Sequence, residues 1–283
     1  MSAPAPLAAL AALVRRPTAR FIVPRPMLGP ATTIVLILAL AALGLAFTYV
    51  DPISIAWHRS LPQWFIFPFR YLTYLGLAGV ILWPTGIAIV LLWLCRRIDL
   101  KRGAKSIIAA IQVRLALIFL AVAVPGLIGT IGKRLIGRLR PPAFDTHGHF
   151  AFEPIGWKAI AQGFPSGHAI TAFAAAVVLG ALWPRARMPL FVLAALIALS
   201  RVVLGSHYPS DAIAGAILGA LMAGLIVRAF AARRLGLKVS AEGKVQPMPG
   251  PSMPRLAALA GSIRDALRRR RPRPPKSAAD ERI

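Results

Sequence analysis

Acidic residues and cysteine are both scarce in this chain of 283 residues. It has 9 Asp and Glu against 34 Lys and Arg, which gives a formal net charge of +25, and its single cysteine is Cys95. A lone cysteine has no intramolecular partner, so a disulfide framework is excluded. Besides Asp211, the only carboxylates that could join a metal site are Asp145 and Glu153, in the loop between the third and fourth apolar stretches. These are too few to predict a two-magnesium site.

Charged residues of either sign make up only 15% of the chain, whereas 57% of its residues are hydrophobic. A soluble domain of this length could not bury so much apolar surface in one core. Several stretches reach the length of about 20 mostly apolar residues that a membrane-spanning helix needs. The composition therefore predicts a polytopic membrane protein.

Six spans are the simplest interpretation, and we expect an all-α polytopic helical bundle with about six transmembrane helices. The short basic loop around Arg96, Lys101 and Lys105 predicts the cytoplasmic side, because such loops are rich in Lys and Arg. Both termini are then cytoplasmic, in a multi-pass protein of the inner (plasma) membrane. The expected spans are residues 32–50, 71–94, 107–131, 168–183, 189–205 and 210–230.

The basic charge lies mainly in the termini and between the apolar stretches. Nucleic-acid binding is not expected, because no aromatic residues interleave with the charges. Contact of the basic termini with anionic lipids explains the positive charge better. Three regions follow: a basic cytoplasmic segment (1–30), a transmembrane domain (31–231) and a basic, largely disordered cytoplasmic tail (232–283). Within the tail, Leu256, Leu259, Ile263 and Leu267 recur at helical spacing and predict a short surface helix.

Two polar blocks flank the third and fourth spans. The first runs from Lys133 to Arg140-Pro141, and on its own it is typical of basic residues that anchor a span to lipid head groups. The second is Pro165-Ser166-Gly167-His168, directly before an apolar helix. A helix start presents unpaired N–H groups and the positive end of a dipole, so Ser166 and Gly167 could wrap an anion.

A third block connects the fifth and sixth spans and contains Arg201, His207 and Asp211. Asp211 lies four positions after His207, and a carboxylate beside an imidazole can orient one ring nitrogen and leave the other free to attack. Each block alone has an ordinary structural explanation. In the six-span topology, however, all three emerge on the same, extracytoplasmic side. Phosphate is the ligand that suits Lys133, Arg140 and Arg201 together with a helix start.

Together the blocks resemble the type 2 phosphatidic acid phosphatase superfamily, also called lipid phosphate phosphatases. All three signatures of that family are present without departure. They read Lys133 to Arg140-Pro141, Pro165 to His168, and Ser200-Arg201 to His207 and Asp211. The resemblance covers about residues 32–230 and does not extend to the tail.

The resemblance implies catalysis through a phosphohistidine. His207 would be the nucleophile, Asp211 would hold its ring, and His168 would protonate the leaving lipid oxygen. The implied phosphate-binding residues are Lys133, Arg140, Ser166, Gly167 and Arg201, and neither a metal nor a cofactor is implied. The expected substrate is a lipid phosphate or pyrophosphate.

Other readings stay open at this point. The same intermediate could transfer phosphate to another lipid, and a cationic cluster could bind an anion or lipid without cleaving it. His147 and His149 lie near Asp145 and could suggest a zinc site, but a third and a fourth ligand are lacking. The sequence does not identify the lipid substrate or the oligomeric state.

Overall fold

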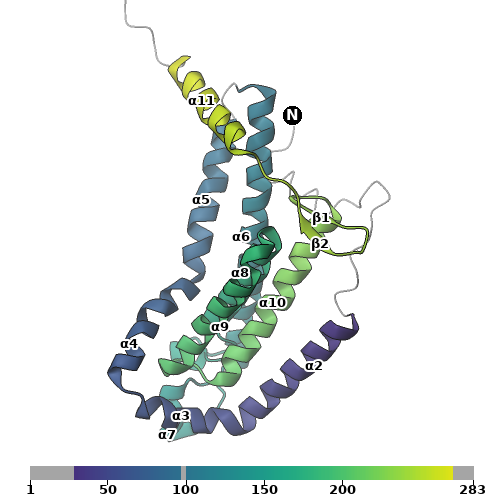
Figure 1. The fold of residues 1–283 in the computed structure, drawn as a ribbon. Coiled ribbons are helices and arrows are strands. Elements are labelled where there is room, and N and C mark those ends of the chain that lie inside the picture. Colours follow the sequence, from purple (N-terminus) through teal and green to yellow (C-terminus); the bar gives the residue numbers. More distant parts are fainter. Residues whose placement is uncertain (1–28, 97–99, 270–283) are drawn as a thin grey trace, which may run out of the picture.

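The computed structural model describes residues 29–96 and 100–269. Within them the chain is almost entirely helical, as Figure 1 shows. Residues 1–28, 97–99 and 270–283 lie outside the described part. The expected N-terminal segment and the last part of the expected tail therefore fall almost wholly outside it.

Most of the long helices run roughly along one bundle axis (Figure 1). Five described segments are long and apolar enough to cross a membrane: Pro30–Ser60, Gln63–Arg96, Arg102–Ile136, Pro184–Val203 and Pro209–Ala232. The apolar helix Gly167–Leu182 is shorter. An all-α membrane bundle is thus confirmed. The principal helices are α2 (Pro30–Leu45), α3 (Asp51–Ser60), α4 (Gln63–Leu72), α5 (Ala78–Arg96), α6 (Arg102–Ile136), α8 (Gly167–Leu182), α9 (Arg187–Val203) and α10 (Pro209–Ala232).

Short elements connect these helices. A π-helical turn joins α2 to α3, and 3-10 turns precede α5 and α9. Between α6 and α8 the chain forms one short helix and two 3-10 turns. The bounds are Ala46–Val50 (π), Thr73–Gly76, Pro141–Ala143, Ala159–Ala161 and Pro184–Ala186 (3-10), and α7 (Phe144–His147).

The centre of the bundle is formed by α6, α8 and α10. Leu117, Val122, Val178 and Phe230 belong to its main apolar cluster. The backbones of α8 and α10 approach closely at Gly215, where a Cβ atom would lie 2.5 Å from the carbonyl oxygen of Ser166. Small residues permit such close packing between membrane helices. This contact brings the start of α8 against the start of α10.

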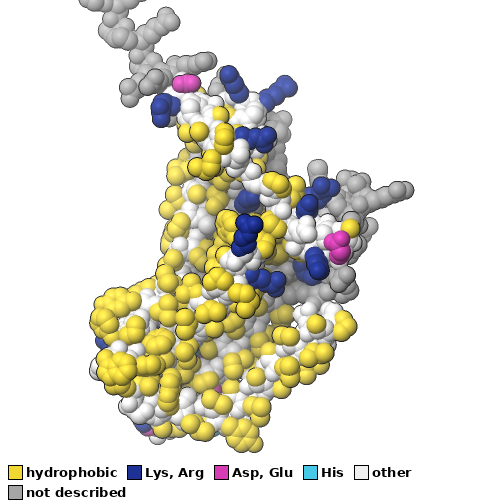
Figure 2. All heavy atoms as spheres, in the orientation of Figure 1, with side chains coloured by type: hydrophobic (Ala, Val, Ile, Leu, Met, Phe, Trp, Pro, Cys, Tyr) yellow, Lys and Arg dark blue, Asp and Glu magenta, His cyan; other side chains and the backbone are white. Residues whose placement is uncertain are grey.

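Large apolar side chains cover the outside of the bundle (Figure 2). Ile34, Leu38, Trp83 and Val90, for example, are each exposed by more than 45%. An exposed apolar belt of this kind fits a lipid environment, because lipid replaces water as its neighbour. In Figure 2, Lys and Arg lie mainly in the half of the molecule that carries α11 and the segment before it.

The region after residue 232 has more structure than we expected. Strands β1 (Leu237–Val239) and β2 (Val245–Pro247) form an antiparallel hairpin, with Lys238 paired with Gln246. Helix α11 (Met253–Arg269) follows, as the apolar spacing predicted. Leu259, on the apolar side of α11, packs with Leu100, Ala104 and Ile108 at and just before the start of α6.

Candidate functional site

The three polar blocks meet at the end of the bundle that lies opposite α11 (Figure 1). The first block is at the end of α6, the second begins α8, and the third joins α9 to α10. His168 interacts electrostatically with Lys133, Arg140, Arg201 and His207. Residues far apart in the sequence therefore converge on one site.

A glycine ends α6 and directs the first block into the site. Gly137 has a φ of 68°, a left-handed conformation that favours glycine. Any side chain here would also collide with the backbone of Glu153. The following segment is extended: Leu139 N donates to Ala151 O at 2.9 Å, and Arg140 N donates to Ile160 O at 2.9 Å. These bonds hold Arg140 beside the start of α8.

The second block begins α8 as expected, with Ser166 at the position before its first turn. Ser166 is fully buried, and its hydroxyl has no hydrogen-bond partner among the described residues. A Cβ atom on Gly167 would lie 3.3 Å from Lys133 Nζ, so the ammonium stands directly beside this helix start. A buried unpaired hydroxyl, a helix N-terminus and an ammonium form an arrangement that suits an anion.

His207 and Asp211 of the third block are both buried. His207 Nδ1 lies 3.4 Å from Asp211 Oδ2. This separation is longer than a well-formed hydrogen bond, and Nδ1 has no other partner among the described residues. Asp211 Oδ2 also accepts a 2.9 Å hydrogen bond from the backbone N–H of Tyr208. The carboxylate is therefore held in place against the ring.

Burial lowers the pKa of His207 to about 4. The positive charges of Lys133 and Arg140 act in the same direction, whereas Asp211 opposes them. The pKa of the Arg140 guanidinium is also lowered by burial. At neutral pH the His207 imidazole is consequently uncharged, which is the form that can act as a nucleophile.

A buried ion-pair network that the sequence analysis did not predict holds Asp211 from the other side. Arg138 Nη1 donates to Asp211 Oδ1 at 2.6 Å, and Arg138 Nη2 donates to Asp51 Oδ2 at 2.7 Å. All three side chains are fully buried. Ser210 completes the group, because its backbone N–H donates to Asp51 Oδ1 at 3.0 Å.

Aromatic rings enclose this network. The Arg138 guanidinium carbon lies 4.1 Å from the ring centre of Phe47 and 4.5 Å from that of Tyr208. A planar cation between two ring faces has little freedom to move. Sequence offered one signal for this network: Asp51 is the only acidic residue before Asp99, and it follows directly after an apolar span.

Lys133, Arg140 and Arg201 differ from Arg138, because none of them forms an ion pair with a carboxylate in the described part of the chain. Arg201 Nη1 donates to Thr73 Oγ1 at 2.7 Å, and its buried Nε has no partner there. The Arg140 contacts to Gln162 O are long, at 3.3 and 3.4 Å. Three cations that form no ion pair among the described residues, around two imidazoles, can hold a dianionic phosphoryl group.

Helix α3 and the turn after α4 support the site, and neither contribution was predicted. His58 Nδ1 lies 2.8 Å from Val203 O, and the His58 ring lies against Gly205. On the other side, a Cβ atom on Gly76 would lie 2.9 Å from His168 Cδ2. His168 is thereby positioned from outside its own helix.

The loop residues considered for zinc are engaged elsewhere. Asp145 Oδ2 accepts a 2.6 Å hydrogen bond from Arg59, and His147 Nδ1 lies 2.6 Å from Thr146 Oγ1. The His149 carbonyl accepts from Arg138 at 3.0 Å. The described residues contain no group of three His, Cys, Asp or Glu placed to hold a metal ion.

The site thus combines a histidine, a carboxylate, a cluster of cations and a helix start at one end of a membrane helical bundle. Residues 114–235 match the model of the PAP2 superfamily. This stretch contains all three blocks. The match agrees with the resemblance to this superfamily seen in the sequence.

Several curated proteins are similar to this chain. A lipid A 1-phosphatase of Rhizobium johnstonii is 38% identical over 128 residues, which are 45% of this chain and 52% of that protein. A lipid A 4'-phosphatase of Bacteroides thetaiotaomicron is 32% identical over 125 residues, or 42% of this chain and 52% of that protein. An undecaprenyl-diphosphatase of Sulfolobus acidocaldarius is 34% identical over 102 residues, or 36% and 48%. The chain thus spans about half the length of the curated relatives it matches.

Among solved structures, a PAP2 type phosphatidylglycerolphosphate phosphatase from Bacillus subtilis has a TM-score of 0.46 and 23% sequence identity. The match covers 69% of this chain and 90% of that chain.

Proposed function

We propose that this protein is a membrane phosphatase that hydrolyses a lipid phosphate or pyrophosphate through a phosphohistidine on His207. The observation that carries the proposal is the convergence of Lys133, Arg140 and Arg201 around a neutral imidazole backed by Asp211. None of the three cations forms an ion pair with a carboxylate among the residues that the structure describes. The match of residues 114–235 to the PAP2 superfamily model supports the same reaction class.

In the first step, His207 Nε2, the ring nitrogen that does not face Asp211, attacks phosphorus. An N–P bond forms while the P–O bond to the lipid breaks. His168, which is protonated once the dianionic phosphoryl group offsets the surrounding positive charge, donates its proton to the departing lipid oxygen. Asp211 faces the Nδ1 proton and stabilises the ring as positive charge develops on it. The three cations and the Gly167 N–H stabilise charge on the equatorial oxygens.

In the second step, water attacks phosphorus and the N–P bond breaks. His168 accepts a proton from this water, inorganic phosphate leaves, and His207 returns to its neutral form. Arg138 and Asp51 do not contact the phosphoryl group in this scheme. They are positioning residues, because they hold the Asp211 carboxylate against the His207 ring.

We place the reaction on the extracytoplasmic face of the membrane, with both described ends of the chain on the cytoplasmic side. Support comes from Arg96, Lys101 and Arg102, which lie where α5 ends and α6 begins, at the far end of the bundle from His207. Basic loops of this kind remain in the cytoplasm.

The test is phosphate release from a panel of lipids in detergent. Lipid A comes first, because two relatives are named for it, followed by undecaprenyl diphosphate, phosphatidylglycerophosphate and phosphatidic acid. His207→Ala should lower the rate by about 10⁴-fold or more. His147→Ala is the matched control and should keep the wild-type rate, because His147 is exposed and lies outside the site. Full activity of His207→Ala would refute the proposal.

A further inference from the structure

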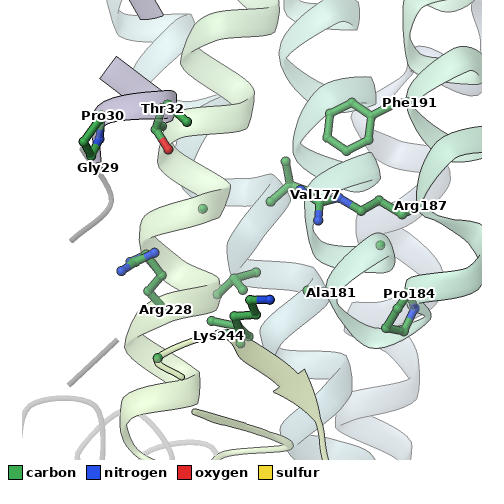
Figure 3. Close-up of a pocket in the computed structure, with 16 residues that line it drawn as sticks. Gly29, Pro30, Thr32, Val177, Ala181, Pro184, Arg187, Phe191, Arg228 and Lys244 are labelled. Carbon is green, nitrogen blue, oxygen red and sulfur yellow. The ribbon is translucent and has the colours of Figure 1, made fainter. Parts of the chain in front are cut away.

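A cavity lies near the ends of α8 and α10 that are remote from His207, and Figure 3 shows the residues that line it. It has a volume of about 860 Å³ and is formed by α2, α8, α9, α10 and the hairpin turn. Ala181, one of its lining residues, follows His168 by 13 positions on α8. At about 1.5 Å per residue this places the two sites roughly 20 Å apart along the helix. The cavity is therefore separate from the phosphoryl site.

The walls of this cavity are mainly apolar. Val177 and Ala181 from α8, Phe191 from α9 and Val227 from α10 line it (Figure 3). Because these helices are membrane spans, such walls suit an acyl chain that enters from the surrounding lipid.

Three basic side chains stand at the same cavity: Arg187 from α9, Arg228 from α10 and Lys244 from the hairpin turn (Figure 3). Among the described residues, none of these side chains has an ion pair or a hydrogen bond. No acidic residue lines the cavity in the described part of the chain. Three cations without counter-charges therefore border an apolar space.

The position of Arg187 is built into the packing of the helices. A Cβ atom on Gly180 of α8 would lie 3.1 Å from Arg187 Cγ, so the arginine stem crosses α8 where that helix has no side chain. The guanidinium thereby reaches from α9 toward Val177, as Figure 3 shows. The positive charge of Arg187 therefore lies beside the apolar wall of the cavity and does not extend away from the bundle.

We infer that this cavity binds an anionic phospholipid of the leaflet opposite the phosphoryl site. Its phosphodiester would lie among Arg187, Arg228 and Lys244, and an acyl chain would lie along Val177 and Phe191. Basic pockets between membrane helices on the cytoplasmic side are a recognised arrangement for acidic head groups. Charge complementarity excludes a preference for zwitterionic lipid, because three unpaired cations need net negative charge.

The test is native mass spectrometry of the full chain in detergent, titrated with phosphatidylglycerol or phosphatidylcholine. Wild-type protein should retain phosphatidylglycerol and bind phosphatidylcholine much more weakly. The triple variant Arg187→Gln, Arg228→Gln, Lys244→Gln should bind phosphatidylglycerol roughly 100-fold more weakly, at about fivefold for each cation lost. Millimolar inorganic phosphate should not displace the lipid, because it has no acyl chain to fill the cavity.

A matched control removes the same charge from exposed positions at this end of the molecule: Arg185→Gln, Arg255→Gln, Arg264→Gln. It should bind phosphatidylglycerol like the wild type. Ala181→Phe keeps all three cations but fills the space, and it should also weaken binding. Size-exclusion profiles establish that each variant is folded. Equal binding by the triple variant and the wild type, equal losses in the triple variant and the control, or displacement by free phosphate would each overturn the inference.

Discussion

The two ends of the bundle hold positive charge in different ways. At the His207 end, Arg138 is fully buried, bonded to two carboxylates and enclosed by two rings. At the other end, Arg187 and Lys244 are exposed beside apolar walls and have no partner among the described residues. A rigid ion-pair network that orients Asp211 against His207 suits a single phosphoryl geometry, whereas a cationic rim over an apolar cavity suits a lipid head group that changes orientation.

After the loss of His207 itself, the largest effect should come from the cations that surround it. Replacing Arg140 or Arg201 with Gln should lower kcat by about 100- to 1000-fold, because each stabilises charge on the phosphoryl oxygens in the transition state. Phosphate release in detergent measures this. Arg134→Gln is the matched control, because Arg134 is exposed and stacks on Trp157 at 4.2 Å. A kcat near the wild-type value for either site variant would show that the cluster does not serve catalysis.

A smaller effect should follow from breaking the buried network at Asp51. Asp51→Asn leaves Arg138 without one of its two carboxylates, and losing one partner of a buried ion pair costs about 3–5 kcal/mol. We expect a lower melting temperature. We also expect kcat to fall by up to about 100-fold with KM little changed, because Asp211 shifts from the His207 ring.

Asp145→Asn provides the comparison for Asp51→Asn. It breaks the exposed pair with Arg59, and exposed pairs contribute little. Neither melting temperature nor kcat should change. If Asp51→Asn lowered the melting temperature but left kcat intact, Asp51 would be structural only.

The smallest expected effect is a displacement of the pH profile. Because burial holds the pKa of His207 at about 4, the acidic limb of kcat/KM should lie near pH 4 and not near the ordinary histidine value of about 6.5. Lys133→Gln removes a positive charge that lowers this pKa, so its limb should move to higher pH. Asp211→Asn removes a charge that raises the pKa, so its limb should move lower. A wild-type limb near 6.5 would contradict a buried, neutral His207.

Much of this architecture could be predicted from sequence, because apolar length and short motifs are local signals. The helix starting at Gly167 and the helix around Leu259 were both predicted in this way. The convergence of the three blocks also followed from the topology. The Asp51–Arg138 pair could not be predicted, because it joins residues 87 positions apart. It also depends on how the start of α3 packs against the segment that follows α6. The hairpin at 237–247 was missed because its polar composition resembles that of a disordered tail.

The central claim is most directly tested by trapping the intermediate. Wild-type protein is mixed with a ³²P-labelled lipid phosphate, quenched under alkaline conditions and digested. The label should appear on the peptide that contains His207, be lost on acid treatment, and be absent from His207→Gln. Equal labelling of His207→Gln, or rapid turnover of the wild type with no acid-labile label at any time, would contradict a phosphohistidine at this residue.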